Sequence, residues 1–237
     1  MNSLCVIPAR GRSKRLKNKN ILNIHGKPLI GYTIEPALAS KLVDRVVVST
    51  DSKKITEVVK SIYRVDVIKR PSEFSKDDSP IEEALLHAVE YLKQKEGYSA
   101  DIIIWLQANV PIRKKGIIDK AIKKIKESDA DSCVTCYRID QLPELMKIID
   151  KKGMLKPVYK NVSSIRYQEF PKRYLLDGSV VVLKTANLYN NSGIRKAHIY
   201  LGKKVIPIVQ EKKIYSLEIH TADDLFLLKY YLDRVQR

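Results

Sequence analysis

The stretch LCVIPARGRSKRLKNKNI, residues 4–21, decides the fold because its character changes abruptly partway along. Residues 4–9 are mostly apolar, which is typical of a buried β-strand. Six of the fifteen residues from Ile7 to Ile21 are Lys or Arg, and none is acidic. A helix is expected over residues 28–40, with Pro28 in its first turn. A buried strand, a loop and a helix in this order predict the first unit of an α/β protein.

Short β-branched runs alternate with amphipathic stretches as far as residue 139. Strands are expected over residues 44–50, 65–70, 101–107 and 131–139, and helices over residues 51–63, 79–97 and 117–128. Asp51 and Ser52 should begin the first of these helices, Ser79 should cap the second and Gly97 should end it. The alternation predicts an α/β fold of Rossmann-like type, with a mostly parallel sheet, helices on both faces and a single domain over residues 1–237.

The alternation breaks after residue 140, where a small excursion over residues 142–177 leaves the core sheet. Residues 144–158 should form a β-hairpin with a Lys-Lys-Gly turn. Further strands are expected over residues 180–184, 203–209 and 215–219, and a last amphipathic helix over residues 221–235 with Thr221 at its cap.

The formal net charge of +17 comes from Lys and Arg residues that are spread over the whole chain. This distribution indicates a general surface bias, and no aromatic-rich RNA-binding motif is present, so nucleic acid is not the expected partner. The longest apolar runs are far shorter than the roughly 20 residues of a membrane span. Cys5, Cys133 and Cys136 are too few for a disulfide framework. We therefore expect a soluble protein in the reducing cytoplasm.

The basic loop follows the first strand, and ligands of open parallel sheets bind beyond the carboxyl ends of the strands. Its segment GRSKRLKN lacks the second glycine and the Lys-Ser or Lys-Thr pair of a P-loop. It can still hold a triphosphate through backbone N–H groups near Gly11 and through the cations of Arg10, Lys14 and Lys19. A merely solvated basic loop is the alternative, and the position of the loop at a strand end favours the anion site.

Seven motifs occur in order along the chain: IPARGRSKRLKNKNI, GKPLIGYTI, DRVVVSTD, RPSEF, LQANVPIR, DGSVVVL and IHTADDL. Together they resemble the motifs of the acylneuraminate (CMP-sialic acid synthetase-like) cytidylyltransferases, a family of sugar nucleotidyltransferases. Each motif is weak alone, but the set extends over nearly the whole chain. The resemblance implies a sheet of the nucleotide-diphospho-sugar transferase type. It also implies a homodimer formed through the excursion at residues 142–177, with part of the acceptor site crossing the interface.

The resemblance implies roles for individual residues. Arg10 and Lys19 match catalytic residues that bind the triphosphate and stabilise charge at the reacting phosphorus, with Lys14 assisting. Further implied contacts are those of Asn20 and Arg70 with the base and ribose, and those of Gln107, Lys147, Arg166 and Asp177 with the acceptor. For Arg113 a structural and a functional role remain equally open.

The metal-binding motif of the family is altered in this chain. Relatives bind Mg²⁺ through an Asp-x-Asp pair, whereas this chain has Glu218-Ile219-His220 at that place. Glu218 is a candidate ligand for Mg²⁺, but an imidazole such as that of His220 is a poor one. Asp223 and Asp224 follow closely, and acids in the first turn of a helix have an adequate structural explanation.

Three hypotheses about function follow. The first is transfer of CMP from CTP to an acidic sugar of the sialic or other nonulosonic acid type, with release of pyrophosphate. The second is another nucleotidyltransferase of this fold that uses a different nucleotide, or an acceptor such as Kdo, a phosphonate or a sugar phosphate. The third is a non-catalytic nucleotide or polyanion binder, whose binding would be unselective and would collapse with salt.

Overall fold

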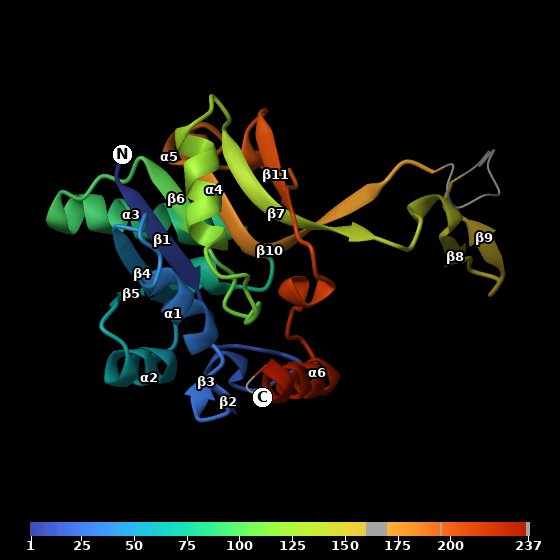
Figure 1. The fold of residues 1–237 in the computed structure, drawn as a ribbon, viewed down its shortest axis with the longest axis horizontal. Coiled ribbons are helices and arrows are strands. Elements are labelled where there is room, and N and C mark those ends of the chain that lie inside the picture. The colour runs from blue at the N-terminus through green and yellow to red at the C-terminus, as the bar shows by residue number, and fades with distance from the viewer. Residues whose placement is uncertain (160–169, 195, 236–237) are drawn as a thin grey trace.

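A seven-stranded sheet forms the centre of the computed structural model, which describes residues 1–159, 170–194 and 196–235 (Figure 1). Its strand order is β11-β7-β10-β6-β1-β4-β5. The bounds are β1 Ser3–Pro8, β4 Arg45–Thr50, β5 Asp66–Lys69, β6 Ile102–Trp105, β7 Ser132–Ile139, β10 Arg173–Lys184 and β11 Val205–Val209. β10 runs antiparallel to both of its neighbours, and the other pairs are parallel. The prediction of a mostly parallel sheet is confirmed.

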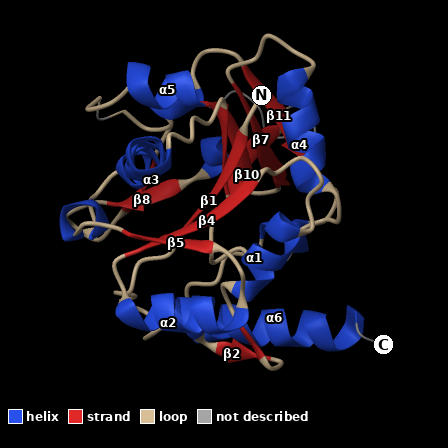
Figure 2. Ribbon diagram, turned by 90° about the vertical axis from the view of Figure 1, so that its left-hand side faces the viewer, coloured by secondary structure: helices blue, strands red, loops and turns tan. Residues whose placement is uncertain are grey.

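Helices cover both faces of this sheet, and each face has its own apolar core. The helices are α1 Gly31–Leu38, α2 Lys53–Ile62, α3 Ile81–Glu96, α4 Ile117–Lys126, α5 Thr185–Asn190 and α6 Ala222–Val235. One core cluster joins β1 to α1, α2 and α4, and the other joins it to α3 and α5. Figure 2 shows α3 and α5 on the side of the sheet opposite to α1 and α4. Among the described residues, no helix is long and apolar enough to cross a membrane.

Successive residues of β1 explain why the strand is apolar along its whole length. Cys5 and Ile7 belong to the core on one face, whereas Leu4 and Val6 belong to the core on the other. Side chains alternate between the two faces of a strand, so a strand covered on both faces must be continuously apolar.

The ends of two helices test the expected capping residues. The Ser52 side chain caps α2 by accepting a hydrogen bond from the Ile55 backbone N–H at 3.4 Å, as predicted. Gly97 ends α3 in the left-handed conformation, with φ of 66°. The expectation for Ser79 is wrong, because Pro80 occupies the cap position and the Ser79 hydroxyl donates to the Glu73 carbonyl oxygen at 2.7 Å.

The excursion forms an arm that projects from the body of the molecule (Figure 1). Its hairpin pairs β8, Lys147–Ile149, with β9, Leu155–Pro157, which confirms the expected hairpin. In the turn, Asp150 Oδ1 accepts hydrogen bonds from the backbone N–H groups of Lys152 and Met154. The long strand β10 begins in the arm and continues into the sheet, so arm and body share one strand.

Two small hairpin strands and several short 3₁₀ helices complete the described fold. The hairpin joins β2 Asn23–Ile24 to β3 Lys27–Pro28, and the 3₁₀ helices are η1 Lys19–Ile21, η2 Ser72–Ser75, η3 Pro143–Leu145, η5 Ile199–Leu201 and η6 Lys213–Ser216. The strand expected over residues 215–219 is therefore wrong. These residues form the end of η6 and an irregular stretch, whose apolar side chains face a third core cluster beneath α6.

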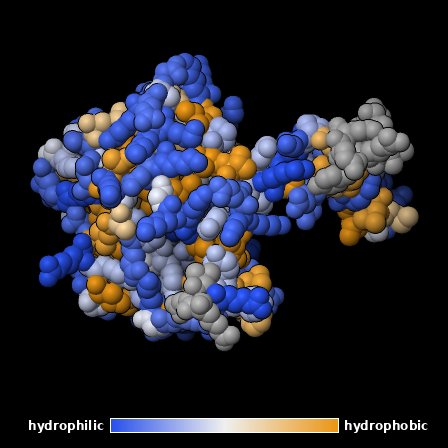
Figure 3. Space-filling model, in the orientation of Figure 1, coloured by the Kyte–Doolittle hydropathy of each residue, from blue (hydrophilic) through white to orange (hydrophobic). Residues whose placement is uncertain are grey.

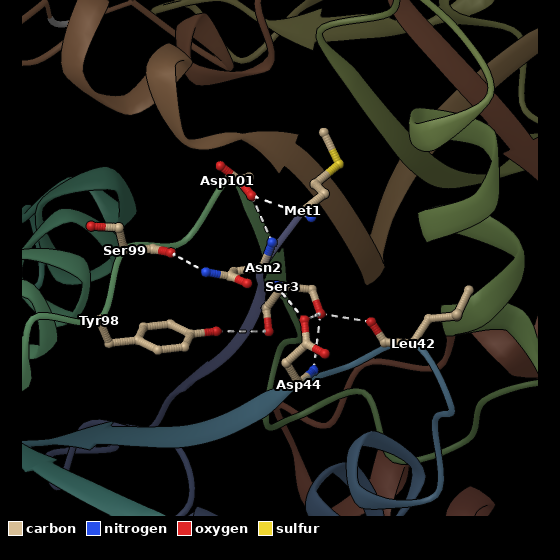
Figure 4. A network of polar contacts seen from close by, with 8 residues as sticks. All are labelled: Met1, Asn2, Ser3, Leu42, Asp44, Tyr98, Ser99 and Asp101. Carbon is tan, nitrogen blue, oxygen red and sulfur yellow. Dashed lines mark hydrogen bonds and ion pairs between the residues drawn. The ribbon is translucent and has the colours of Figure 1, made fainter.

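A polar network closes the amino end of the sheet, at the start of β1 (Figure 4). Asp44 Oδ2 accepts hydrogen bonds from the backbone N–H of Ser3 at 2.7 Å and from its hydroxyl at 2.8 Å. Asp101 Oδ2 accepts a hydrogen bond from the Asn2 backbone N–H at 2.6 Å. The two carboxylates tie the first strand to the segments that lead into β4 and β6.

We expect Asp44→Ala to lower the free energy of unfolding by about 1 kcal/mol at pH 7, because hydrogen bonds to an exposed carboxylate contribute little more. The hydrogen bonds from the Ser3 side chain and backbone lower the pKa of Asp44. Its stabilisation is therefore complete above the ordinary carboxyl pKa of about 4 and is lost as the pH falls through the lower folded value. Urea unfolding at pH 7 and pH 2.5 should show the difference between wild type and variant shrinking in acid. Asp78→Ala, a change at an exposed acid, is the control, and an equal effect of the two changes would contradict this role.

Candidate active site

A cavity of about 600 Å³ opens beyond the carboxyl ends of β1, β5 and β6. Pro8, Arg70 and Trp105 mark these strand ends in its wall. Four segments line it: the basic loop, residues 70–84, residues 105–109 and residues 218–220. The size suits a small-molecule ligand, and the place is the one at which parallel sheets bind ligands.

Positive charge dominates the lining of this cavity. Its cationic side chains are Arg10, Lys14, Arg15, Lys19, Arg70 and Lys76, and its acids are Asp77 and Glu218. A cleft lined by charge of one sign concentrates ligands of the opposite sign. The geometry therefore favours a polyanion such as a triphosphate over a neutral or cationic ligand.

Lys19 lies where the basic loop meets the carboxyl-terminal part of the chain. Its ammonium group donates a hydrogen bond to the Ile219 carbonyl oxygen at 2.8 Å. Burial and the nearby charge of Arg10 lower the pKa of Lys19. An anion that enters the cavity would offset both effects, so Lys19 is placed to respond to a bound phosphate.

Asn20 and Arg70 are buried polar residues that face the same cavity, with 6% and 5% of their surface exposed. Asn20 Nδ2 donates to the Arg10 carbonyl oxygen at 3.1 Å. Arg70 Nε has no hydrogen-bond partner among the described residues, and burial lowers the pKa of this side chain. Buried polar atoms normally have partners, so this part of the wall fits a ligand with its own donors and acceptors.

Asp77 neutralises part of the basic loop in the structure. Its carboxylate forms ion pairs with Arg10 at 2.7 Å and with Lys14 at 2.5 Å. The hydrogen bond from Lys14 holds the pKa of Asp77 below its usual value. The Asp77 carboxylate is thus paired with both of the cations that were expected to bind phosphate. A polyphosphate that binds these cations must displace the carboxylate.

We expect Asp77→Asn to increase the affinity for inorganic triphosphate about fivefold, because the anion no longer has to break two exposed ion pairs. Calorimetric titration at low salt would measure the dissociation constant. Asp78→Asn removes the same charge from the neighbouring exposed residue and is the matched control. Unchanged or weaker binding by the Asp77 variant alone would show that the carboxylate organises the loop rather than competing with the ligand.

Gln107 reaches the cavity because Gly178 leaves room for it. A Cβ atom at residue 178 would lie 2.1 Å from Gln107 Nε2, and the backbone of Gly178 has φ of 61°. The Gln107 backbone N–H also donates to the Gly178 carbonyl oxygen at 3.3 Å. Glycine is thus required at this position for two reasons, the left-handed backbone conformation and the close approach of the Gln107 side chain.

Arg113 has a structural role, which settles the question that the sequence left open. Its guanidinium donates to the carbonyl oxygens of Ser179, Val110 and Gln107 and to the Thr33 hydroxyl. Burial lowers its pKa to about 10, so the group stays charged at neutral pH. Arg113 is not part of the cavity wall, and it fixes the loop that carries Gln107.

Three of the expected site residues are not brought to the cavity. The Gly11 backbone N–H donates to Asp51 Oδ1 at 2.7 Å, and a Cβ at residue 11 would lie 2.7 Å from Ser52 Cβ, so Gly11 packs the loop against α2. Asp177 is 1% exposed and bonded within the core. Lys147 is exposed on β8 of the arm. Arg166 lies outside the described residues.

The Asp177 carboxylate accepts three hydrogen bonds inside the sheet. The donors are the Thr135 hydroxyl at 2.5 Å, the Ser179 backbone N–H at 2.9 Å and the Ser216 hydroxyl at 2.8 Å. A buried carboxylate with its oxygens satisfied in this way is a structural element. It anchors η6, and hence the segment that carries Glu218, to β7 and β10.

Glu218 and His220 both line the cavity, on either side of the buried Ile219. Asp224, the expected helix-start acid, accepts hydrogen bonds from the backbone N–H groups of His220 and Thr221. In the described part of the chain, no group of three or more His, Cys, Asp or Glu side chains could hold a metal ion. A cation at this place would need ligands from a bound substrate as well.

Several residues of the cavity wall were not predicted from the sequence, among them Arg15, Phe74, Ser75, Lys76 and Asp77. Four of these, residues 74–77, lie in or just after η2, in the segment that leads from β5 to α3. The rule that loops at carboxyl ends of parallel strands form the site would have found this segment, since it is polar and follows an expected strand.

Comparisons with known proteins identify the relatives of this chain. A family model described as "Cytidylyltransferase" matches residues 4–216. Pseudaminic acid cytidylyltransferase of Campylobacter jejuni subsp. jejuni is 37% identical over 130 residues, which are 55% of this chain and 56% of that protein. CMP-N,N'-diacetyllegionaminic acid synthase of Legionella pneumophila subsp. pneumophila is 29% identical over 234 residues, 98% of this chain and 97% of that protein.

The fold is also that of a solved structure, CMP:2-keto-3-deoxy-manno-octonic acid synthetase complexed with CTP. The TM-score is 0.72 at 19% identity, and the match covers 99% of each chain. This chain spans about half the length of the Campylobacter relative and of related streptococcal proteins. The family model covers residues 4–216, which are most of the chain, so the chain belongs to the cytidylyltransferase family.

Proposed function

We propose that the chain transfers CMP from CTP to an acidic sugar of the sialic or other nonulosonic acid type and releases pyrophosphate. The observation that carries the proposal is the convergence of six cationic side chains and the buried Asn20 on one cavity at the carboxyl edge of the sheet. The names of the pseudaminic acid and legionaminic acid relatives support an acidic sugar as acceptor. A cytoplasmic location is part of the proposal, supported by three buried free cysteines.

In the proposed reaction, a sugar hydroxyl oxygen attacks the α-phosphorus of CTP, and the hydroxyl proton is released to solvent. The new P–O bond forms as the bond to the bridging oxygen of pyrophosphate breaks. Arg10, Lys14 and Lys19 would neutralise the charge that develops on the phosphates, a large term in phosphoryl-centre displacements. Asn20 and Arg70 would hold the base and ribose, and Gln107 would face the acceptor.

A divalent cation, Mg²⁺ in the resemblance, is part of the proposal. When bound, it would neutralise negative charge on the triphosphate. The residue that would hold it is Glu218, the carboxylate in the cavity wall beside Lys19.

Thermal unfolding with CTP, UTP, ATP and GTP, with and without divalent cation and at two salt concentrations, tests the proposal first. A ligand at 100 times its dissociation constant stabilises the folded state by about 2.7 kcal/mol. CTP should give a selective, salt-tolerant shift, after which pyrophosphate release with nonulosonic acids identifies the acceptor. Selectivity for another nucleotide would replace the proposal with a different nucleotidyltransferase. Equal shifts that salt abolishes would indicate a polyanion binder, and neither alternative is favoured by the comparisons.

We expect Gly178→Ala to raise the KM for the acceptor about tenfold, because the new Cβ would expel the Gln107 side chain from its place. The left-handed backbone adds a stability cost of about 1–2 kcal/mol. Gly153→Ala is the matched control, since it has φ of 77° but no atom within 4 Å of the new Cβ. Pyrophosphate release at varied acceptor concentration separates the two variants. If both leave the KM for the acceptor unchanged, Gln107 does not contact the acceptor.

A homodimer formed through the arm is also part of the proposal. Eleven of the twenty-two exposed large hydrophobic residues in the described part of the chain lie between Leu145 and Leu176. Figure 3 shows hydrophobic side chains at the far end of the arm. An isolated two-stranded hairpin is marginally stable in water, and monomers rarely expose large apolar patches, so the arm fits a second copy as its partner. Lys147 would then approach the acceptor site of the other copy.

The dimer is tested by light scattering after size-exclusion chromatography. Ile149 and Leu155 face each other across the hairpin and are 71% and 70% exposed. The double change Ile149→Lys, Leu155→Lys should convert a dimer of wild type into a monomer. Ile194→Lys, at an exposed apolar residue outside the arm, is the control. A monomeric wild type at micromolar concentration would remove this part of the proposal.

A further inference from the structure

Part of the cavity wall is apolar, and a phosphate group has no use for such a surface. Its residues come from η2, from the start of α3 and from the end of β6, and they are Phe74, Pro80, Ile81, Ala84 and Trp105. The buried polar residues Asn20 and Arg70 line the same cavity. Ligand pockets commonly combine apolar surface with a few placed polar groups. This combination fits a flat ring, which has apolar faces and a polar edge.

Phe74 and Trp105 are the two aromatic residues in the described wall of this cavity. Trp105 is 8% exposed, and its ring packs edge-on against the buried Tyr200 at 5.8 Å, so it belongs mainly to the core. Phe74 is only half-buried, in the short helix η2. Phe74 therefore offers the more open aromatic surface to a ligand.

The ring of His87 packs against Phe74. Their centroids are 5.8 Å apart with an angle of 52° between the rings, and the Tyr91 ring lies 6.3 Å from that of His87. Both separations are typical of favourable aromatic pairs. His87 follows Ala84 by one turn of α3, so it lies on the side of the helix that meets the cavity, but it is not part of the wall. It supports Phe74 from outside the cavity.

The polar atom Nδ1 of His87 does not explain the position of this ring. Nδ1 is buried and has no hydrogen-bond partner among the described residues. Burial and the charge of Arg70 lower the pKa of His87, so the imidazole is uncharged at neutral pH. An uncharged ring whose buried nitrogen lacks a partner contributes through the packing of its ring.

We propose that Phe74 is the surface on which the base of the nucleotide stacks, and that His87 is a positioning residue that holds Phe74 in place. This rests on the proposed function, in which Asn20 and Arg70 hold the base and ribose. A base stacked on Phe74 would turn its polar edge toward the wall that contains Arg70, whose Nε is a buried donor with no partner among the described residues. Stacking on an aromatic side chain tolerates any base, so Phe74 supplies affinity and the polar residues supply selectivity.

Calorimetric titration of the full chain with CTP and with inorganic triphosphate separates contacts to the base from contacts to the phosphates. Phe74→Leu should weaken CTP binding about tenfold, the loss of one stacking contact, and leave triphosphate binding within about twofold of wild type. Phe226→Leu makes the same change at an exposed residue of α6 outside the cavity wall and should alter neither affinity. Equal weakening of both ligands by Phe74→Leu, or of neither, would overturn the stacking role.

His87 is tested by loss and rescue. His87→Ala should weaken CTP binding about fivefold and leave triphosphate binding unchanged, because Phe74 loses the ring that supports it. His87→Phe restores a ring without nitrogen atoms and should recover the CTP affinity to within about twofold of wild type. Failure of His87→Phe to recover this affinity would show that the imidazole acts through a polar contact, and the positioning role through its ring would be wrong.

The two ligands also distinguish failure of this inference from failure of the proposed function. If wild type binds CTP more tightly than triphosphate and Phe74→Leu keeps the difference, the proposed function stands and the base does not stack on Phe74. If wild type binds CTP no more tightly than triphosphate, the cavity does not recognise a nucleotide, and the proposed function and the stacking role fail together.

Discussion

Lys19→Ala should lower kcat/KM for CTP by about 100- to 1,000-fold, the effect of removing one charged group that stabilises the transition state of such a displacement. Lys19 is held beside the cavity by the Ile219 carbonyl, and burial and Arg10 lower its pKa. Its charge is therefore poorly compensated in the free protein and is stabilised when a phosphate arrives. Initial rates of pyrophosphate release over a range of CTP concentrations would measure the effect.

The control for Lys19 is Lys17→Ala, in the same loop. Lys17 is exposed and is not part of the cavity wall, so its loss should leave kcat/KM within about threefold of wild type. Melting curves must accompany both variants, because Lys19→Ala also removes the hydrogen bond to Ile219. Equal losses of activity in the two variants would show that the loop acts through its total charge and that Lys19 has no particular role.

Arg113→Met should lower the free energy of unfolding by about 4 kcal/mol, the range found when a buried charge or hydrogen-bond network loses one member. The change leaves the carbonyl oxygens of Ser179, Val110 and Gln107 without their guanidinium donor. It also removes the positive charge that interacts with the buried carboxylate of Asp177. Methionine keeps much of the side-chain volume, so the effect reports the polar contacts. Urea unfolding at pH 7 gives the free energy.

Arg138→Met provides the comparison, because Arg138 is an exposed residue of β7. Its replacement should change the free energy of unfolding by no more than about 0.5 kcal/mol. A difference of less than about 1 kcal/mol between the two variants would mean that the loop at residues 107–113 relaxes to satisfy its own carbonyl groups.

Much of the sheet was predictable because its signals are local. The continuous apolar runs of β1 and β6 follow from burial on both faces of the sheet. The amphipathic pattern of α2 follows from burial of one side of the helix. The segment 215–219 has the same apolar alternation as a strand, but Ile219 is buried against a small cluster under α6 and pairs with no strand. Alternation reveals which side chains are buried, and it does not reveal whether a neighbouring strand is there to pair with.

The site was predictable in position but less so in detail. Arg10 and Lys19 lie in the loop after β1, and Arg70 follows β5, with β4 between the two strands, so all three reach one cavity at the carboxyl edge of the sheet. Gly11 and Asp177 have the right place in the motif, but their polar atoms are bonded to Asp51 and Thr135. Asp77 was missed because its pairing with Arg10 depends on how the segment after β5 folds back. Such side-chain pairings depend on distances between loops that no local pattern encodes.

The strand β10 belongs both to the arm and to the central sheet. This one strand starts at Arg173 in the arm, passes Gly178 beside Gln107 and ends at Lys184 against β6. Its register against β7 shifts between Leu176 and Val181, so the strand is irregular at the point where it passes the cavity. One continuous strand therefore connects the arm to the glycine that makes room for Gln107. Whatever the arm binds would be joined, through the backbone of this strand, to the residue that positions Gln107.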